Sequence, residues 1–427
     1  MQNLSSKIVI VGAGPSGLLL AHYLLRCQYQ VAIYDRRPDP RKADPNQNRS
    51  FPISLQDRGR KALRGIPGLE DAIAAQSTFC QGTVLHNKRK SRDIKRKNVV
   101  LTIDRNRLVL TLLEQLIIKY PEAAQQLYFG YTCQEINDNQ KKVTFSNDNH
   151  QEISVDYDFL IGADGARSQV RKQLAEKYGL KSEETYVRDA YKSIFLARTN
   201  SKKGIELAPD RIHASNFGKD SRIVLAPQSG DCLHGAFIFN AAKNPLEGFT
   251  SKEEIVAYFQ EKLPTFCELM SEEEAEALLH RPVARLVTVK CDRFHHGNHI
   301  LILGDAAHAV SPSIGQGCNS ALQDVYLVNQ LLDTYQNDFS QIPAQFSQQR
   351  VADAHALRDL SDYSFPRSKL LIVEFFLRLT LGRKLHTWFP HWFKPFLFDQ
   401  ILDTDLSYSE VLHLNSKWIN KVKKSMA

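Results

Sequence analysis

The sequence predicts an α/β protein, because three glycine-containing turns each follow a short run of apolar residues. The turns are Gly12–Gly17, Gly162–Gly165 and Gly304–His308, and the runs before them are Ile8–Val11, Phe159–Ile161 and Ile300–Leu303. Fully apolar runs of this length are typical of buried strands in a parallel sheet. Since ligands bind outside the carboxyl ends of such strands, we expect the three turns to surround one ligand.

The composition narrows the class of protein. A chain of 427 residues predicts two domains or one elaborated domain. No apolar run is long enough for a transmembrane helix, and no signal peptide precedes the first strand. The seven cysteines form no Cys-x-x-Cys pair, which predicts a reducing cytoplasm, no disulfide framework and no metal site.

The net charge of +8 is concentrated in one segment. Residues 88–97 include seven lysines and arginines. We interpret this run as a solvated hairpin loop, with contact to an anionic lipid surface as the alternative. No nucleic-acid-binding motif accompanies it, so no nucleic-acid partner is expected.

The predicted elements follow in order along the chain. A helix over Gly17–Arg26 and a strand over Val31–Tyr34 complete the first unit, and the polar residues 36–50 form a loop. Helices are predicted over Gln56–Ala75, with a break at 65–68, and over Arg105–Lys119. Alternating segments such as Ser193–Leu196 and Gly235–Phe239 predict an antiparallel sheet. Helices are then expected over 251–279, 315–336 and roughly 344–427.

The first turn has the spacing of a dinucleotide-binding motif. Gly12 permits the tight turn, Gly14 lets the backbone approach a pyrophosphate, and Gly17 lets the helix pack closely on the strand. The helix that follows offers free N–H groups and partial positive charge to phosphates. Asp35 ends the second strand, where a carboxylate can accept hydrogen bonds from ribose hydroxyls. Ser16 and Arg36 are assigned to the same site, and the motif alone leaves NAD and FAD both possible.

The other two turns resemble those of the FAD-dependent aromatic monooxygenases that share the fold of para-hydroxybenzoate hydroxylase. The matching segments are Asp164-Gly165, Gly304-Asp305 with the loop to Pro312, and Gly315–Asn319. The resemblance implies that Asp164 lies near the pyrophosphate and that Asp305 accepts hydrogen bonds from the ribityl chain. It also implies that the N–H groups of Gly317, Cys318 and Asn319 face the pyrimidine side of the flavin. Arg105 matches an arginine that reaches FAD, and the Pro312–Gly315 loop lines the flavin.

Further segments resemble the kynurenine 3-monooxygenase family in particular. They are Arg49-Ser50, Arg58–Leu63, Val289–Cys291 with Phe294-His295, and Arg350–Ser361. The resemblance implies FAD as cofactor, NADPH or NADH as reductant and O2 as co-substrate. It implies hydroxylation of an aromatic or other electron-rich small molecule through a flavin hydroperoxide. The expected architecture is an FAD-binding Rossmann-like three-layer domain (1–71, 101–181 and 290–343), an inserted antiparallel substrate domain (72–100 and 182–289) and a C-terminal helical region (344–427).

The chain departs from that family at the residues that hold the substrate carboxylate. The family's arginine falls on Thr83, and residues 87–100 contain no tyrosine. The family's asparagine falls on Ser364, and its second tyrosine falls near Leu397 or Phe398. A buried carboxylate needs a charged or hydrogen-bonding partner. We therefore predict that L-kynurenine is not hydroxylated efficiently.

Several alternatives remain open at this level. One is an FAD-dependent reductase or an epoxidase acting on an apolar, isoprenoid-like substrate, and another is a non-catalytic FAD-binding protein. A halogenase is excluded, because Trp388, Trp392 and Trp418 form no Trp-x-Trp motif. The aromatic C-terminal segment is interpreted as a lid over the core, with peripheral membrane contact as the alternative. His308 is interpreted as structural, residues 295–299 as a loop, and the protein as a monomer or homodimer.

Overall fold

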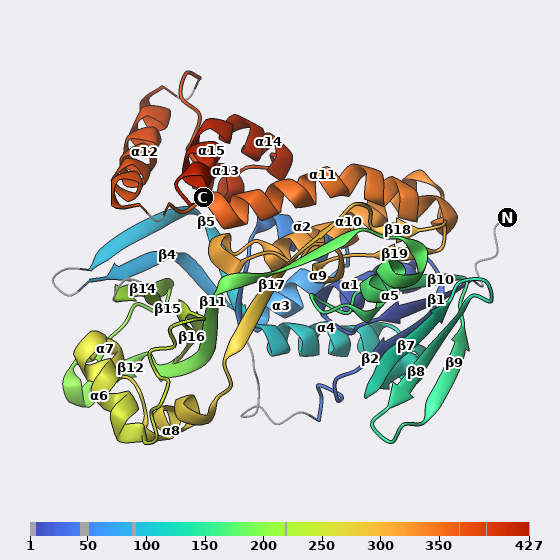
Figure 1. Cartoon of the computed structure of the whole chain (residues 1–427), viewed down its shortest axis with the longest axis horizontal. Helices are drawn as coiled ribbons and strands as arrows, with labels where there is room; N and C mark the ends of the chain where they lie inside the picture. The colour runs from blue at the N-terminus through green and yellow to red at the C-terminus, as the bar shows by residue number, and fades with distance from the viewer. Residues whose placement is uncertain are drawn as a thin grey trace.

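A computed structural model describes residues 6–42, 51–87, 91–217, 220–366, 368–389 and 391–426. One sheet has six strands in the order β18-β19-β10-β1-β2-β6 (Figure 1). Their bounds are β1 Lys7–Val11, β2 Gln30–Asp35, β6 Leu127–Phe129, β10 Phe159–Gly162, β18 His295–His296 and β19 Ile300–Ile302. All neighbours are parallel except β18 and β19. The three apolar runs therefore form adjacent parallel strands, as predicted. His295 and His296 form a strand, so the loop interpretation was wrong for them.

Helices cover both faces of this sheet and complete its core. They are α1 Pro15–Arg26, α2 Asp57–Arg64, α3 Leu69–Ala75, α4 Arg105–Lys119, α5 Gln169–Tyr178, α9 Asp305–His308 and α10 Gly317–Thr334. Helix α4 begins where it does because the Asp104 side chain accepts hydrogen bonds from the backbone N–H groups of Asn106 and Arg107. A three-stranded sheet of β7 Tyr131–Asn137, β8 Lys142–Asn147 and β9 Glu152–Asp156 lies at the outer end of this unit (Figure 1).

The second large sheet has eight strands in the order β17-β11-β16-β15-β14-β4-β5-β3. Their bounds are β3 Pro52–Leu55, β4 Thr78–His86, β5 Arg92–Asp104, β11 Ser182–Ala197, β14 Arg211–Phe217, β15 Ser221–Gln228, β16 Cys232–Asn240 and β17 Ala284–Cys291. The predicted antiparallel sheet is present, except that β4 and β14 are parallel, and it also includes residues 52–55 and 101–104. The division into an FAD-binding domain, a substrate domain and a C-terminal region at the predicted boundaries stays a prediction. Residues 92–97 belong to β5, so the loop interpretation of the basic run was wrong there; residues 88–90 lie outside the described part.

The eight-stranded sheet has an outer and an inner face. Helices α6 Lys252–Lys262, α7 Pro264–Cys267 and α8 Glu272–His280 cover the outer face, where Ile223 and Leu225 are buried. The inner face carries the alternate residues, including Arg222, Val224 and Ala226. The Thr102 hydroxyl of β5 donates to the Pro227 carbonyl of β15 at 2.7 Å, although β4 and β14 separate these strands in the sheet. The sheet therefore curls around its inner face.

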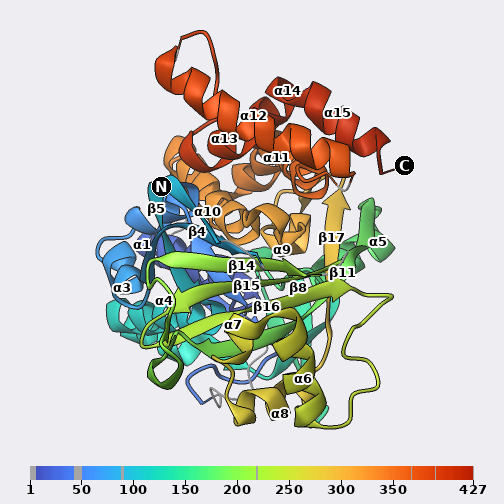
Figure 2. The same cartoon turned by 90° about the vertical axis from the view of Figure 1, so that its left-hand side faces the viewer.

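The C-terminal region is helical, as predicted. It consists of α11 Ile342–Tyr363, α12 Lys369–Trp388, α13 Leu397–Asp403, α14 Tyr408–Leu414 and α15 Ser416–Lys424. Helices α12–α15 lie above the end of the large sheet formed by β4 and β5 (Figure 2). They share a core that includes Leu357, Phe375, Leu397 and Trp418. Within the described ranges, none of the helices combines the length and apolarity needed to cross a membrane.

The remaining elements are short. A two-stranded hairpin is formed by β12 Thr199–Asn200 and β13 Ile205–Glu206. The 3-10 helices are η2 Pro121–Gln126, η3 Ser201–Lys203, η4 Pro312–Ile314 and η5 Phe339–Gln341.

Candidate functional site

The three glycine turns meet at one edge of the six-stranded sheet. A Cβ atom on Gly12, whose φ is +112°, would lie 2.4 Å from the Ala163 carbonyl oxygen of the second turn. A Cβ atom on Gly304, whose φ is +60°, would lie 2.8 Å from Ser16 Oγ of the first turn. Only glycine tolerates both the positive φ and the close approach at these two positions. The first turn therefore contacts the other two directly.

The glycines of the first turn have the geometry that a pyrophosphate site requires. A Cβ atom on Gly17 would lie 2.0 Å from the Gly12 carbonyl oxygen, so α1 packs closely against the turn. A Cβ atom on Gly14 would meet nothing nearer than a carbonyl oxygen 4.0 Å away. Gly14 thus faces open space at the N-terminus of α1, where the partial positive charge of the helix favours an anion.

Asp35 lies at the end of β2 and accepts hydrogen bonds from several donors. Its Oδ2 accepts from the Ala13 N–H at 2.7 Å, and its Oδ1 accepts from the Arg37 N–H at 2.8 Å. The Arg37 guanidinium binds both carboxylate oxygens. Burial alone would raise the pKa of Asp35, but Arg37 and the two N–H groups hold it below its ordinary value. The predicted Arg36 has an exposed side chain instead. Two adjacent arginines in sequence do not reveal which of them turns back toward Asp35.

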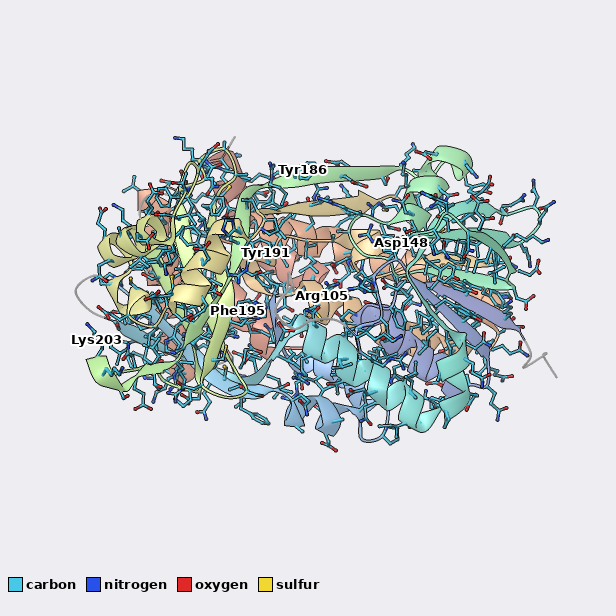
Figure 3. The ribbon with its side chains drawn as sticks, turned by 90° about the horizontal axis from the view of Figure 1, so that it is seen from below. Arg105, Asp148, Tyr186, Tyr191, Phe195 and Lys203 are labelled. Atoms are coloured by element: carbon cyan, nitrogen blue, oxygen red, sulfur yellow. The ribbon has the colours of Figure 1, made fainter. Side chains whose placement is uncertain are left out.

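Arg105 begins α4 near the centre of the molecule, on the side where β11 carries Tyr191 and Phe195 (Figure 3). Burial lowers the pKa of Arg105, and so does the nearby charge of Arg37. The acidic groups that act on it in the opposite direction are Asp305, Cys318 and Asp35. Four residues predicted for the site, far apart in sequence, are thus close enough to interact. Among the described residues, none forms a hydrogen bond or ion pair with Arg105.

The N-terminus of α10 provides further donors. Gln316 precedes the helix, and the Ser320 N–H is the donor to its carbonyl at 2.8 Å. The N–H groups of Gly317, Cys318 and Asn319 come before that first helical hydrogen bond, so the helix itself gives them no acceptor. Burial raises the pKa of the Cys318 thiol to about 12, which keeps it neutral.

The Asn319 side chain has a structural task. Its Oδ1 accepts from the Gln56 N–H at 2.8 Å, and its Nδ2 donates to the Ser54 carbonyl at 2.9 Å. It therefore joins α10 to β3 of the large sheet. The predicted contact between its backbone N–H and a cofactor stays a prediction.

Asp164 of the second turn retains an unused acceptor. Its Oδ2 accepts hydrogen bonds from the N–H groups of Gln169, at 2.7 Å, and Val170, at 3.3 Å. Its Oδ1 is buried without a partner among the described residues. Burial raises the pKa of Asp164. A buried acceptor without a partner is uncommon, and an additional hydrogen-bonding group would satisfy it.

Behind the third turn lies a buried network that the sequence did not predict. Asp324 of α10 accepts hydrogen bonds from the Gly304 N–H at 2.8 Å, from His308 Nε2 at 2.6 Å and from Arg350 Nε at 2.6 Å. Burial alone would raise the pKa of Asp324, but His308 and Arg350 hold it below its ordinary value. Arg350 also binds Asp353. His308 is therefore structural, as interpreted from the sequence.

The C-terminal helices reach the site through a second chain of polar contacts. The Tyr408 hydroxyl donates to Gln316 Oε1 at 2.9 Å, and Gln316 Nε2 donates to Gln56 Oε1 at 2.5 Å. Arg58 donates to the Thr404 carbonyl at 3.0 Å, and its guanidinium lies 4.8 Å from the centre of the Tyr408 ring. Helix α14 is thereby tied to the N-terminus of α10.

A cavity separates the inner face of the large sheet from the loop that follows the third turn. It is a narrow cavity of about 20 Å³, part of it open to solvent. The lining residues are Phe51, Val187, Asp189, Tyr191, Arg222, Ile238, Leu286, Ser311 and Pro312. Most of this surface is apolar, and the Arg222 guanidinium is paired with Asp189 at 2.8 Å. Pro312, predicted to line the flavin, thus also borders this cavity.

The positions of the family's carboxylate-binding residues carry no charge here. Thr83 pairs with Ile94 within the large sheet. The buried Ser364 hydroxyl donates to the Leu360 carbonyl, and Leu397 lies in the core of the C-terminal helices. Arg49 and Ser50, which resemble the family, lie outside the described residues.

Comparisons with known proteins agree with this arrangement. Residues 5–359 match the model of a family described as the FAD binding domain. Kynurenine 3-monooxygenase of Sus scrofa is 28% identical over 98% of this chain and 88% of its own. The enzyme of that name from Neurospora crassa is 30% identical over 100% of this chain and 89% of its own. Among solved structures, the tetrameric form of 2-methyl-3-hydroxypyridine-5-carboxylic acid oxygenase has a TM-score of 0.68, with 19% identity over 84% of this chain and 91% of its own.

The chain therefore belongs to the FAD-binding domain family, among proteins related to kynurenine 3-monooxygenase. It is an FAD-dependent monooxygenase that acts on aromatic substrates, with NADPH and O2 as the usual reductant and co-substrate of these enzymes. The predicted fold class and cofactor are confirmed.

Proposed function

We propose that the three turns, Arg105 and the N-terminus of α10 bind FAD so that its ring lies against the inner face of the large sheet. The observation that carries the proposal is that Arg105 lies close enough to Asp35, Asp305 and Cys318 to interact with all three, while the first turn contacts the other two directly. Gly14 leaves room for a pyrophosphate, and Asp164 Oδ1 is buried without a partner among the described residues. The residues present therefore fit the cofactor.

Each element has a separate task in binding. The N-terminus of α1 receives the pyrophosphate, and Asp35 accepts hydrogen bonds from ribose hydroxyls. Asp305, which is exposed at the third turn, accepts hydrogen bonds from the ribityl chain. The N–H groups of Gly317–Asn319 face the pyrimidine side of the ring, where a helix N-terminus stabilises negative charge.

FAD supplies the redox chemistry: it takes electrons from NADPH and passes an oxygen atom from O2 to the substrate. The protein orients the aromatic substrate and excludes water. Tyr191 and Ile238 of the large sheet and Pro312 provide the apolar walls. His308 is hydrogen-bonded to Asp324, which gives it a structural task, and the Cys318 thiol is neutral and therefore a poor nucleophile.

We further propose that L-kynurenine is a poor substrate, because Thr83, Ser364 and Leu397 offer no charge where the relatives' family places its carboxylate anchors. The test is turnover of the FAD-loaded protein with NADPH, recording NADPH oxidation, O2 consumption and product. Aromatic compounds other than L-kynurenine are expected to accelerate flavin reduction and to give hydroxylated product. Rapid coupled formation of 3-hydroxykynurenine would contradict the substrate assignment. Flavin reduction that no aromatic compound accelerates would favour the non-catalytic alternative.

We also propose that α12 rests on a lipid surface. Leu370, Val373, Leu377 and Leu381 repeat at helical spacing on this helix and are 83%, 59%, 61% and 56% exposed. An apolar stripe of this kind, on a helix that is not apolar enough throughout to span a membrane, is typical of interfacial helices. We propose that the protein is cytoplasmic and is a monomer or homodimer. Size-exclusion chromatography with light scattering tests the oligomeric state.

Vesicle flotation tests the membrane contact. The wild type is expected to float with vesicles of phosphatidylcholine and phosphatidylserine. The L377S/L381S variant is expected to remain in the bottom fraction of the gradient. Ile118→Ser is the matched control, because Ile118 is 70% exposed on α4, away from this stripe. Equal flotation of all three proteins, or flotation of none, would contradict the proposal.

A further inference from the structure

The inner face of the large sheet contains a second arginine, Arg96, in an irregular part of β5. Cys80 pairs with Val100, and Gly82 pairs with Lys95. Two pairs that are two residues apart on β4 are therefore five residues apart on β5. The extra residues form a bulge, and Arg96 is the first residue in it after Lys95. Bulges redirect side chains that a regular strand would point elsewhere.

Arg96 is half-buried, and its guanidinium has no partner among the described residues. Its Nη1 is buried without a hydrogen-bond acceptor. No hydrogen bond or ion pair connects this guanidinium to any residue in the described ranges. A buried donor without an acceptor is costly, and a buried charge without a partner is more so. Such a group in a folded protein requires an explanation. Binding of an anionic ligand is a direct explanation, because the ligand would accept the hydrogen bond.

The surroundings of Arg96 place it at the substrate side of the sheet. Burial lowers its pKa, and the ionisable side chains close enough to influence that pKa are Cys80, Asp403 and Arg383. Cys80 packs with Val100, Ile212 and Ala226, a small apolar cluster. Ala226 lies four residues along β15 from Arg222, so both face the inner side of the sheet that lines the cavity.

The neighbouring charges leave Arg96 available to a ligand. Arg383 of α12 is held by Asp399 at 2.6 Å. Asp403 of α13 lies near enough to influence Arg96, but no hydrogen bond or ion pair joins the two side chains. Helix α13 contacts β5 and closes this end of the curled sheet. Arg222, by contrast, is already paired with Asp189.

We propose that Arg96 binds a carboxylate of the aromatic substrate, beneath α13 on the inner face of the large sheet. The inference rests on the proposed function. It makes Arg96 a specificity-determining residue, which holds the substrate and takes no part in the oxygen transfer. It also favours an aromatic substrate that carries a carboxylate. The alternative was an apolar substrate, which stayed open because Thr83 stands where the family has an arginine. Arg96 lies on β5, whereas Thr83 lies on β4. A substrate whose carboxylate binds Arg96 therefore places its aromatic ring differently from a substrate whose carboxylate binds at position 83.

The test compares carboxylates with their neutral amides on the FAD-loaded protein. The probes are anthranilate, salicylate, phenylacetate and L-kynurenine, each beside its amide, and binding is measured from the change in the flavin absorbance spectrum. At least one carboxylate is expected to bind the wild type at least 10-fold more tightly than its amide. Arg96→Met should weaken carboxylate binding by roughly 10- to 100-fold and leave amide binding unchanged, because one charge-assisted hydrogen-bonded pair is lost.

Two further variants control for charge and folding. Arg96→Lys should restore part of the preference for the carboxylate. Lys95→Met removes the same charge from the exposed neighbour and should change neither affinity. Arg96→Met should retain FAD and unfold at no lower a denaturant concentration than the wild type, because the residue removed has no partner.

The outcomes separate this inference from the proposed function. If amides and carboxylates bind the wild type equally, or if Arg96→Met binds both like the wild type, Arg96 does not hold the substrate, whereas the monooxygenase assignment stands. The same conclusion follows if neutral aromatics accelerate NADPH oxidation and no carboxylate in the set binds. If no aromatic compound of either kind binds or accelerates NADPH oxidation, both proposals fail.

Discussion

Asp324 gives the sharpest test of how the third turn is held. Its side chain is 0% exposed and accepts hydrogen bonds from the Gly304 N–H, from His308 and from Arg350. Asp324→Asn keeps the shape but removes the charge, and its new NH2 group faces these donors. Breaking a buried ion pair by changing one partner costs roughly 3–5 kcal/mol. That is a large share of a typical free energy of unfolding of about 5–15 kcal/mol.

Urea denaturation of the FAD-free protein measures this loss, and flavin fluorescence measures FAD affinity, which should fall because Asp324 positions Gly304. The control is Asp57→Asn, whose ion pair with Arg64 has side chains 53% and 42% exposed. That pair contributes about 0–1 kcal/mol. A loss below about 1 kcal/mol for Asp324→Asn, equal to the control, would refute the reasoning.

The same network predicts the direction of a pH effect. The pKa of Asp324 is lowered in the folded protein. The ionised Asp324 carboxylate therefore stabilises the fold fully at pH values above about 3.9, the pKa of an aspartate in the unfolded chain. This stabilisation disappears as the pH falls through the lower pKa that Asp324 has in the folded protein. The difference in unfolding free energy between wild type and Asp324→Asn should thus shrink below about pH 4. A difference that grows in acid would show that the sign is wrong.

Three other substitutions test the site. Gly14→Val should weaken FAD binding by roughly 100-fold, while the FAD-free protein loses less than about 1 kcal/mol, because the new side chain enters space that the pyrophosphate needs; unchanged FAD affinity would contradict this. Gly17→Ala should destabilise the FAD-free protein itself, since its Cβ would lie 2.0 Å from the Gly12 carbonyl oxygen, and an unchanged urea midpoint would refute that. Tyr408→Phe removes the hydrogen bond to Gln316 and should cost about 1 kcal/mol in urea, with a rise in the dissociation constant of FAD; a stability equal to wild type would mean that α14 is not coupled to the site.

The sequence by itself determined the strands, the turns and the cofactor class. Runs such as Ile8–Val11 and Ile300–Leu303 are apolar throughout because both sides of a parallel strand are buried, and glycine is required where backbones touch. These signals are local, so they can be read from a few consecutive residues. The spacing from Gly12 to Gly17 is of the same kind, because one turn and the start of one helix contain the whole requirement.

Only the tertiary structure decided which polar groups meet. Asp324 and Arg350 are 26 residues apart, and Gln316 and Tyr408 are 92 residues apart, so nothing in the sequence near either member marks the pair. Arg96 shows the same limit: it stands in a run of basic residues that indicates a solvated surface, and only the structure shows that its Nη1 atom is buried beside a bulge in β5. The physical reason is that ion pairs and hydrogen bonds depend on the distance between side chains, which the packing of whole elements sets, whereas strand burial and turn geometry are written into neighbouring residues.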